Sequence, residues 1–271
     1  MINSSLEQAF GKAKQSGACA FIPFMTAGFP DVPTFLEILT ALDRNGADII
    51  EVGLPFSDPL ADGPVIQRAS KQALDNGVTP PLVLDLIARA RRTIKSPVVI
   101  MSYWNPILKM GPSVFAARAI ESGAAGAIIP DLPPEEADPW LEAAGSRGLA
   151  TIFMIAPTTT PQRRQRILNL GQGFLYYVSL TGVTGSDFTV TEELVREILA
   201  LKAQARLPVA VGFGVAGPEQ ARPLSSVADG VIVGSALIRR VAAQKNSAAQ
   251  VAAAAGFADL LSQALRHREE S

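Results

Sequence analysis

Three acids close together in the sequence form the arrangement most suited to chemistry. Glu51 interrupts the apolar run 47–53, and Asp58 and Asp62 follow in the Gly/Pro-rich segment 54–64. The run has the character of a strand buried on both faces, where a carboxylate is costly unless it is neutralised, paired or used. We therefore expect acid/base chemistry at this strand end. A glutamate held in a structural salt bridge is the alternative.

Strand alternation predicts different roles for Glu51 and Asp62. If Ile50 and Val52 face outward, Glu51 points inward, where burial raises its pKa toward the range useful for giving and recovering a proton. Asp62, on the loop, is expected to stay ionised and to accept a hydrogen bond from a substrate N–H. An ordinary turn residue before Gly63 is the alternative for Asp62.

Glycines near the end of the chain predict an anion site. Gly214 closes one expected strand, and Gly234-Ser235 closes the next one at the start of a helix over 236–241. Glycines let backbone amides approach an anion, and a helix N-terminus adds partial positive charge. These positions favour phosphate over simple turn glycines. The small-residue segment 180–188 is expected to be a lid or a flexible connector.

Composition narrows the class of protein. The 271 residues are 48% hydrophobic, with 24 basic and 25 acidic side chains, so nucleic acid and anionic membranes are poor partners. No apolar stretch is long enough to span a bilayer, and the first ten residues lack the pattern of a signal peptide. The only cysteine, Cys19, lies in an apolar run. We expect a cytoplasmic protein.

Missing residue types exclude several mechanisms. The only histidine, His267, lies in the charged tail, so no Ser-His-Asp triad, Cys-His pair or histidine metal site can be assembled. Acids do not cluster as a carboxylate magnesium site requires, and we expect no metal. No lysine lies in an expected strand, which excludes a Schiff-base aldolase. Carbon–carbon chemistry here must use carboxylates and a substrate with its own electron sink.

Eight buried runs alternate with helical patterns along the chain. The expected strands are 20–25, 47–53, 98–103, 126–130, 150–156, 174–179, 208–214 and 230–234. The expected helices are 33–42, 113–122, 135–147, 161–170, 218–225, one from Pro80 capped by Thr79, and one after Thr189 and Glu192 at capping-box spacing. Continuous apolar runs indicate parallel strands covered on both faces.

This order predicts an α/β fold, a (β/α)8 TIM barrel that forms a single domain over residues 1–271. Extra helices over 6–15 and 247–266 would flank it. A doubly wound open sheet is the competitor, but it needs a Gly-rich turn after its first strand, and 26–30 fits poorly.

Several motifs together resemble one family. The segment 50–63, IEVGLPFSDPLADG, is similar over its whole length to the signature of tryptophan synthase alpha chains. Segments 21–28, 103–106, 130–133, 176–185, 212–214 and 234–235 are similar to that family in the same order. The resemblance covers nearly all of the chain.

The resemblance implies a metal-free retro-aldol cleavage of indole-3-glycerol phosphate to indole and glyceraldehyde 3-phosphate. It implies that Glu51 and Asp62 are catalytic, with Tyr176 in the pocket beside Glu51. Its phosphate contacts match Gly185, Gly214, Gly234 and Ser235. Phe24, Leu60 and Ile155 are expected as apolar walls for the indole, with core packing as the alternative.

The family also implies a partner, the beta chain, in an alpha2-beta2 heterotetramer. The beta chain carries pyridoxal phosphate, and no cofactor is expected in this chain. Contacts with the partner are expected at Pro55, Ser57, Asp58 and Asn105.

Three other functions are alternatives. A stand-alone indole-3-glycerol-phosphate lyase would release free indole. A non-catalytic scaffold is disfavoured because Glu51 and Asp62 are both present. A phosphosugar isomerase would normally need a histidine or lysine near the barrel mouth.

Overall fold

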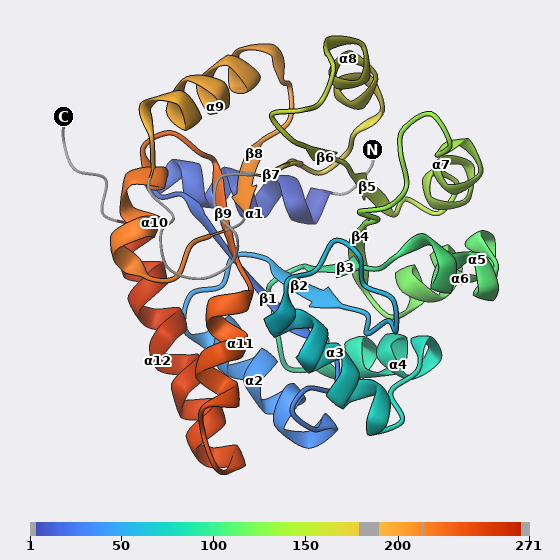
Figure 1. Ribbon diagram of the computed structural model, residues 1–271, viewed down its shortest axis with the longest axis vertical. Coiled ribbons are helices and arrows are strands. Elements are labelled where there is room, and N and C mark those ends of the chain that lie inside the picture. The colour runs from blue at the N-terminus through green and yellow to red at the C-terminus, as the bar shows by residue number, and fades with distance from the viewer. Residues whose placement is uncertain (1–3, 179–189, 213, 267–271) are drawn as a thin grey trace.

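Parallel strands form one sheet that curls into a barrel, with helices around it (Figure 1). This computed structural model describes residues 4–178, 190–212 and 214–266. Within them the sheet has nine strands in the order β5-β4-β3-β2-β1-β9-β8-β7-β6, and every pair is parallel. The strands are β1 (Ala20–Thr26), β2 (Ile50–Gly53), β3 (Val98–Met101), β4 (Ala124–Ile128), β5 (Ala150–Ile152), β6 (Met154–Ile155), β7 (Leu175–Val178), β8 (Val209–Gly212) and β9 (Gly230–Val233).

The barrel closes through one short stretch of chain. The two edge strands, β5 and β6, are separated only by Phe153; β5 pairs with β4, and β6 pairs with β7. The stretch expected as one strand over 150–156 is therefore divided in two. Because β5 and β6 together fill one strand position, the nine strands fill the eight positions of a barrel, which confirms the predicted (β/α)8 barrel.

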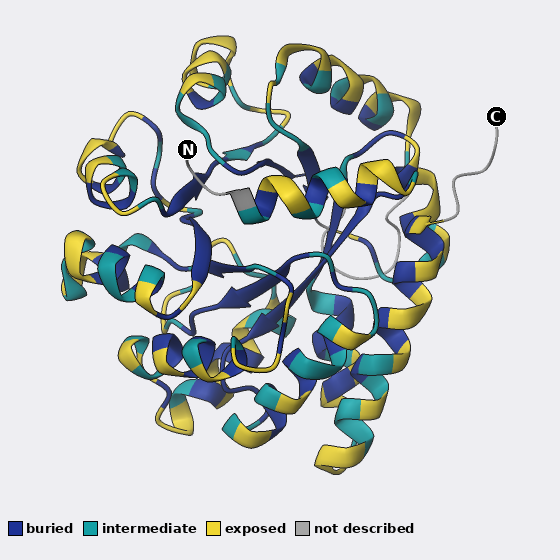
Figure 2. Ribbon diagram, turned by 180° about the vertical axis from the view of Figure 1, so that it is seen from behind, coloured by how far each residue is buried: buried dark blue, intermediate teal, exposed yellow. Residues whose placement is uncertain are grey.

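Helices cover the outer face and the N-terminal end of the barrel (Figures 1 and 2). They are α1 (Ser4–Gln15), α2 (Val32–Arg44), α3 (Pro64–Asp75), α4 (Pro80–Ala90), α5 (Trp104–Met110), α6 (Pro112–Glu121), α7 (Asp138–Gly145), α8 (Pro161–Leu170), α9 (Glu192–Gln204), α10 (Pro218–Ser225), α11 (Ser235–Ala242) and α12 (Ser247–Arg266). The two expected extra helices are present: α1 crosses the start of the strands, and α12 packs on α2, α10 and α11. No helix in the described ranges is both long and apolar enough to cross a membrane.

Some expected element boundaries were wrong. Helices α3 and α5 were not predicted: α3 begins at the Gly63-Pro64 pair and α5 has Pro106 in its first turn, and both are signals typical of loops. The capping box at Thr189 and Glu192 is also incorrect, because Thr191 is the N-cap, which puts Glu192 at the first helical position rather than the third; the Thr191 hydroxyl accepts a hydrogen bond from the Leu194 N–H at 3.2 Å. Thr189 lies outside the described residues.

Two apolar clusters fix which way the β2 side chains point. Ile50 and Val52 belong to the cluster between strands and helices, whereas Ile49 belongs to the cluster inside the barrel, together with Leu6 and Phe10 of α1. Alternation therefore turns Glu51 inward, as predicted.

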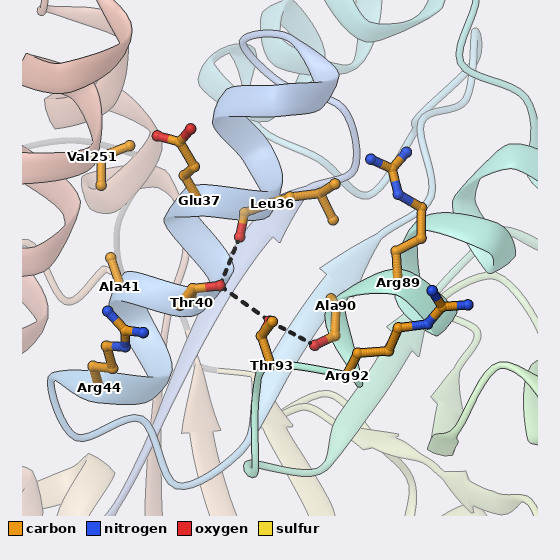
Figure 3. A pocket seen from close by; sticks show the side chains of 10 residues that line it. All are labelled: Leu36, Glu37, Thr40, Ala41, Arg44, Arg89, Ala90, Arg92, Thr93 and Val251. Atoms are coloured by element: carbon orange, nitrogen blue, oxygen red, sulfur yellow. Dashed lines mark hydrogen bonds between the residues drawn. The ribbon is translucent and has the colours of Figure 1, made fainter.

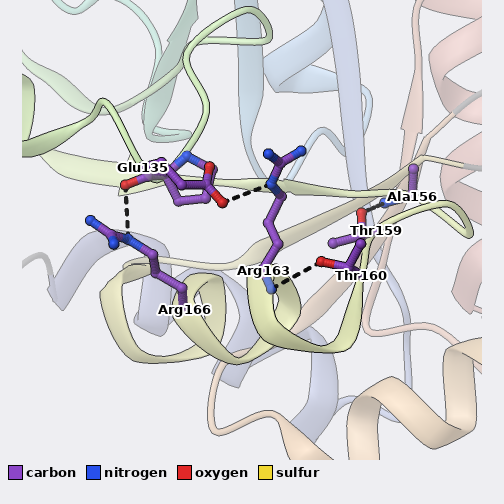
Figure 4. Close-up of polar contacts among 7 residues, drawn as sticks. Glu135, Ala156, Thr159, Thr160, Arg163 and Arg166 are labelled. Atoms are coloured by element: carbon purple, nitrogen blue, oxygen red, sulfur yellow. Dashed lines mark hydrogen bonds and ion pairs between the residues drawn. The ribbon is translucent and has the colours of Figure 1, made fainter.

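Polar contacts at the rim tie α8 to the loop after β4 (Figure 4). Arg163 pairs with Glu135 at 2.9 Å, and Arg166 donates to the Pro134 carbonyl at 3.0 Å. Thr160 caps α8 by accepting the Arg163 N–H at 3.3 Å. The Arg163–Glu135 pair is largely exposed, so it orders the rim more than it stabilises the fold.

Candidate active site

Among the described residues, Glu51 is the only acidic or basic residue that is buried. Its side chain is 1% exposed, and neither carboxyl oxygen has a hydrogen-bond partner among residues 4–178, 190–212 and 214–266. Burial, followed by the nearby charge of Asp62, raises the pKa of Glu51 to about 8. The carboxyl group is therefore mainly protonated at neutral pH and able to donate that proton.

Asp62 faces Glu51 from the loop after β2. Its pKa is raised to about 6 by burial, while a hydrogen bond with the Tyr103 side chain acts in the opposite direction. Asp62 is thus mainly ionised at neutral pH. One acid is neutral and its neighbour is charged, which is the division of protonation states that general acid catalysis beside an anion requires.

A cavity joins these two acids. It is lined by Phe24, Glu51, Ala61, Asp62, Gly63, Ile66, Met101, Met154, Tyr176, Ile232, Gly234 and Ser235. Two glycines make room for its aromatic walls: a Cβ on Gly53 would lie 2.4 Å from the Phe24 ring, and one on Gly212 would lie 2.4 Å from the Tyr176 ring. Burial, with the charges of Glu51 and Asp62, raises the pKa of Tyr176 well above its usual value and keeps its hydroxyl neutral.

The cavity is small in this structure, at about 70 Å³. Small-molecule sites usually measure roughly 300–1,000 Å³, so a substrate can enter only if lining side chains or loops move. Met101 and Met154 are suited to that movement because an unbranched thioether side chain adapts its shape at little cost.

The structure brings together six of the predicted site residues and separates others. Phe24, Glu51, Asp62, Tyr176, Gly234 and Ser235 all line the cavity. Gly214 is exposed, with φ +82°, and is not among the lining residues. Gly185 lies outside the described residues.

Two expected walls of the cavity are misplaced. Leu60 is 93% exposed on the outside of the loop, so it does not line the cavity. Ile155 is fully buried but packs in the cluster between strands and helices. Met154, one residue earlier, faces the cavity instead, because neighbouring residues of a strand point to opposite faces.

Tyr103 was missed as a site residue. It is 3% exposed, and its hydroxyl accepts the Ala61 N–H at 3.0 Å beside Asp62. It ends the strand expected over 98–103, and a tyrosine between a strand and a loop is able to donate a hydrogen bond to an acidic neighbour.

Residues expected at the partner surface divide by burial. Ser57, Asp58 and Asn105 are exposed on the loop after β2 and on the first turn of α5. Pro55 is buried, which corrects its expected place on that surface, because the chain turns inward before it emerges at Ser57.

A larger groove lies elsewhere, between α2, α4 and α12 (Figure 3). It has a volume of about 560 Å³ and is lined by Leu36, Glu37, Thr40, Ala41, Arg44, Arg89, Ala90, Arg92, Thr93 and Val251. Its arginines are exposed and it offers a single carboxylate, so it lacks the paired acids found at the barrel mouth. Among the described residues no cluster of three or more His, Cys, Asp or Glu side chains could hold a metal ion.

A (β/α)8 barrel with a protonated glutamate facing an aspartate at its mouth is the arrangement of a barrel enzyme, because both acids lie where barrel enzymes carry their active sites. The family model for the tryptophan synthase alpha chain matches residues 10–265. The chain belongs to that family.

Relatives agree in sequence and in structure. The alpha chain of Gloeobacter violaceus is 50% identical over 224 residues, covering 82% of this chain and 81% of that protein. The alpha chain of Synechococcus sp. strain CC9902 is 44% identical over 256 residues, 94% of both chains. The crystal structure of the Legionella pneumophila alpha chain superposes with a TM-score of 0.90 at 36% identity and covers 100% of both chains.

Membership of the family assigns the activity. Alpha chains are lyases of tryptophan biosynthesis that cleave indole-3-glycerol phosphate, and their partner is a beta chain. The alpha chain uses no cofactor of its own, since pyridoxal phosphate belongs to the beta chain. The predicted family and reaction are therefore confirmed.

Proposed function

We propose that Glu51 and Asp62 perform this cleavage as a proton shuttle and a fixed anion. The observation that carries the proposal is the buried Glu51 carboxyl, which has no hydrogen-bond partner among the described residues, has a pKa of about 8 and faces Asp62 across the cavity. A carboxyl group left unpaired in a core is costly, and a substrate that fills the cavity offers the partner it lacks.

The chemistry balances with these two residues alone. Glu51 gives its proton to C3 of the indole ring, which converts the ring into an indoleninium cation. Asp62 accepts a hydrogen bond from the ring N–H and stabilises the positive charge. The Glu51 carboxylate then takes the proton of the hydroxyl next to C3. The carbon–carbon bond breaks, its electrons enter the ring, and indole and glyceraldehyde 3-phosphate form with Glu51 protonated again.

Other lining residues would hold the substrate. Phe24, Tyr176, Met101 and Met154 offer apolar surface for the indole ring. Gly234 and Ser235 lie at the N-terminus of α11, where free backbone N–H groups and the helix dipole favour a phosphate. Gly185 and Gly214 are proposed as further phosphate contacts from the family resemblance.

The working assembly is proposed to be an alpha2-beta2 heterotetramer in the cytoplasm, with this chain as one barrel domain over residues 1–271. Ser57, Asp58 and Asn105 are the proposed contacts with the beta chain. Two exposed leucines support an interface there: Leu60 is 93% exposed beside Asp58, and Leu108 is 55% exposed on the same helix as Asn105.

An indole-release assay tests the mechanism. The purified chain, alone and with a beta chain, should convert indole-3-glycerol phosphate into equal amounts of indole and glyceraldehyde 3-phosphate. Glu51→Gln should lower turnover by about a thousandfold or more, because it removes the transferable proton while keeping shape and neutrality. Substrate binding by the variant, measured by calorimetry, should persist. Retained turnover in Glu51→Gln would reject the proton shuttle.

A charge placed at α11 tests the phosphate site. Ser235→Asp should raise KM by about tenfold or more with a smaller effect on kcat, because its carboxylate repels the phosphate. Ser235→Ala is the matched control and should stay near wild type. An unchanged affinity of Ser235→Asp for glycerol phosphate would show that the anion binds elsewhere.

A further inference from the structure

The loop that carries Asp62 is held from two sides. On one side, the Gln67 amide of α3 donates to the Asp62 carbonyl at 2.9 Å. On the other side, the Tyr103 hydroxyl accepts the Ala61 N–H at 3.0 Å and also hydrogen bonds to the Asp62 carboxyl. Gln67 thus holds the main chain of Asp62, and Tyr103 is the contact that reaches its reactive group.

Tyr103 is itself fixed in place. It follows β3 and is 3% exposed, with its ring centroid 5.5 Å from that of Phe56. The next residue, Trp104, donates its N–H to the Asp131 carboxylate at 2.8 Å. With the ring held, the hydroxyl has few available directions.

The hydrogen bonds of the hydroxyl determine where its proton goes. A tyrosine hydroxyl has one proton to donate and lone pairs to accept with. The Ala61 N–H occupies the accepting side, which leaves the proton for the Asp62 carboxylate. A donor aimed at a carboxylate favours its charged form.

We propose that Tyr103 is a positioning residue that aims the Asp62 carboxylate into the cavity and keeps it anionic for the substrate N–H. This inference rests on the proposed role of Asp62. The other titratable groups around this contact within the described residues are Glu51 and Tyr176, which face Asp62, and Asp131, which acts on Tyr103. None of these three groups is a cation. Tyr103 is therefore the side chain that favours the anionic form of Asp62.

The wild-type pH profile supplies the baseline. The active form needs Asp62 ionised and Glu51 protonated, so kcat/KM should follow a bell with limbs at about 6 and about 8. Loss of the Tyr103 donor raises the pKa of Asp62 and should move the acidic limb upward by about one pH unit. The alkaline limb should stay in place, because Asp62 is ionised there in both proteins.

Three proteins separate positioning from simple support of the loop. Tyr103→Phe should lower kcat/KM about 10- to 100-fold on the acidic side of the pH profile and shift the acidic limb to higher pH. Gln67→Met removes the hydrogen bond to the Asp62 carbonyl and should lower kcat/KM without shifting either limb of the pH profile. Thermal unfolding followed by circular dichroism checks that both variants are folded. A uniform loss in Tyr103→Phe with an unmoved acidic limb, or no loss, overturns the inference.

A titration of Asp62 by carboxyl ¹³C NMR gives the same answer without turnover. The midpoint should lie at about 6 in the wild type and higher in Tyr103→Phe, with Gln67→Met unchanged. This measurement separates two failures. An inactive wild type with the expected titration rejects the proposed function and keeps the Tyr103 contact, whereas an unshifted titration in Tyr103→Phe rejects the contact alone.

Discussion

Asp48 and Glu51 lie three positions apart and have opposite surroundings. Asp48, just before β2, accepts the Phe21 N–H at 2.9 Å, and the charges of Arg266 and Lys12 favour its anion. Glu51, within β2, has no hydrogen-bond partner among the described residues, and the charge that acts on its pKa is that of Asp62, an anion. Burial is the largest influence on both and raises both pKa values.

The difference separates an acid that supports the fold, Asp48, from an acid that is placed to react with a ligand, Glu51. At the N-terminal end, helix α1 closes the barrel with Leu6 and Phe10, and the Phe10 ring lies 5.4 Å from that of Phe174. An acid there must be satisfied by the fold itself. At the carboxyl end the strands open into a cavity, and Glu51 stays unsatisfied until a ligand arrives. A core can hold such a group only at a cost in stability.

The largest stability effect is therefore expected at Glu51. Its folded-state pKa of about 8 lies above the ordinary value of 4.5 for a glutamate, so the native protein binds a proton more tightly than the unfolded chain. The stability that Glu51 gains from this tighter proton binding is fully present below about pH 4.5 and is lost as pH rises through about 8. Glu51→Gln should raise the unfolding free energy by up to about 4 kcal/mol near pH 9, and little near pH 5.

Urea unfolding of wild type and Glu51→Gln across that pH range checks the sign. A gain that is equal at both pH values would mean that the substitution acts through packing rather than charge. The comparison with Asp48 would then lose its physical basis.

A smaller effect is expected at Asp48. Asp48→Ala leaves the Phe21 N–H without its acceptor, so the unfolding free energy should fall by about 1–3 kcal/mol. Asp48→Asn keeps an acceptor oxygen and should cost less. Both variants should keep a kcat/KM close to wild type in the indole-release assay. A large loss of turnover in Asp48→Asn would place this acid in the reaction and remove the contrast with Glu51.

Sequence alone predicted the barrel and the inward turn of Glu51, because both depend on local pattern. Buried runs identify strands, and the parity of Ile50 and Val52 fixes the face of Glu51. The same rule, counted from inward-facing Ile152, assigns Met154 to the cavity and Ile155 to the helices. The error at Ile155 was thus a slip of one residue, which reverses every side chain of a strand.

Other features depended on contacts that no pattern contains. Leu60 has the residue type of a pocket wall, but the path of the loop turns it outward. The role of Tyr103 follows from its approach to Ala61, a residue 42 positions away in the chain. Helix α3 begins at a Gly-Pro pair that local signals assign to a turn, and its position is set by packing against β1 and α11.

The smallest effect is expected on the outside of the same mouth. Leu60→Ala removes a side chain that is 93% exposed, so the unfolding free energy should change by less than about 0.5 kcal/mol. The KM of the isolated chain should also stay unchanged, because the residue does not line the cavity. Titration with a beta chain then separates two roles for this leucine. Weaker activation of the variant supports a partner contact, whereas a raised KM without the partner would return Leu60 to the indole wall, through a closed state of the loop. In that case the mouth, unlike the end closed by α1, is completed only when substrate binds.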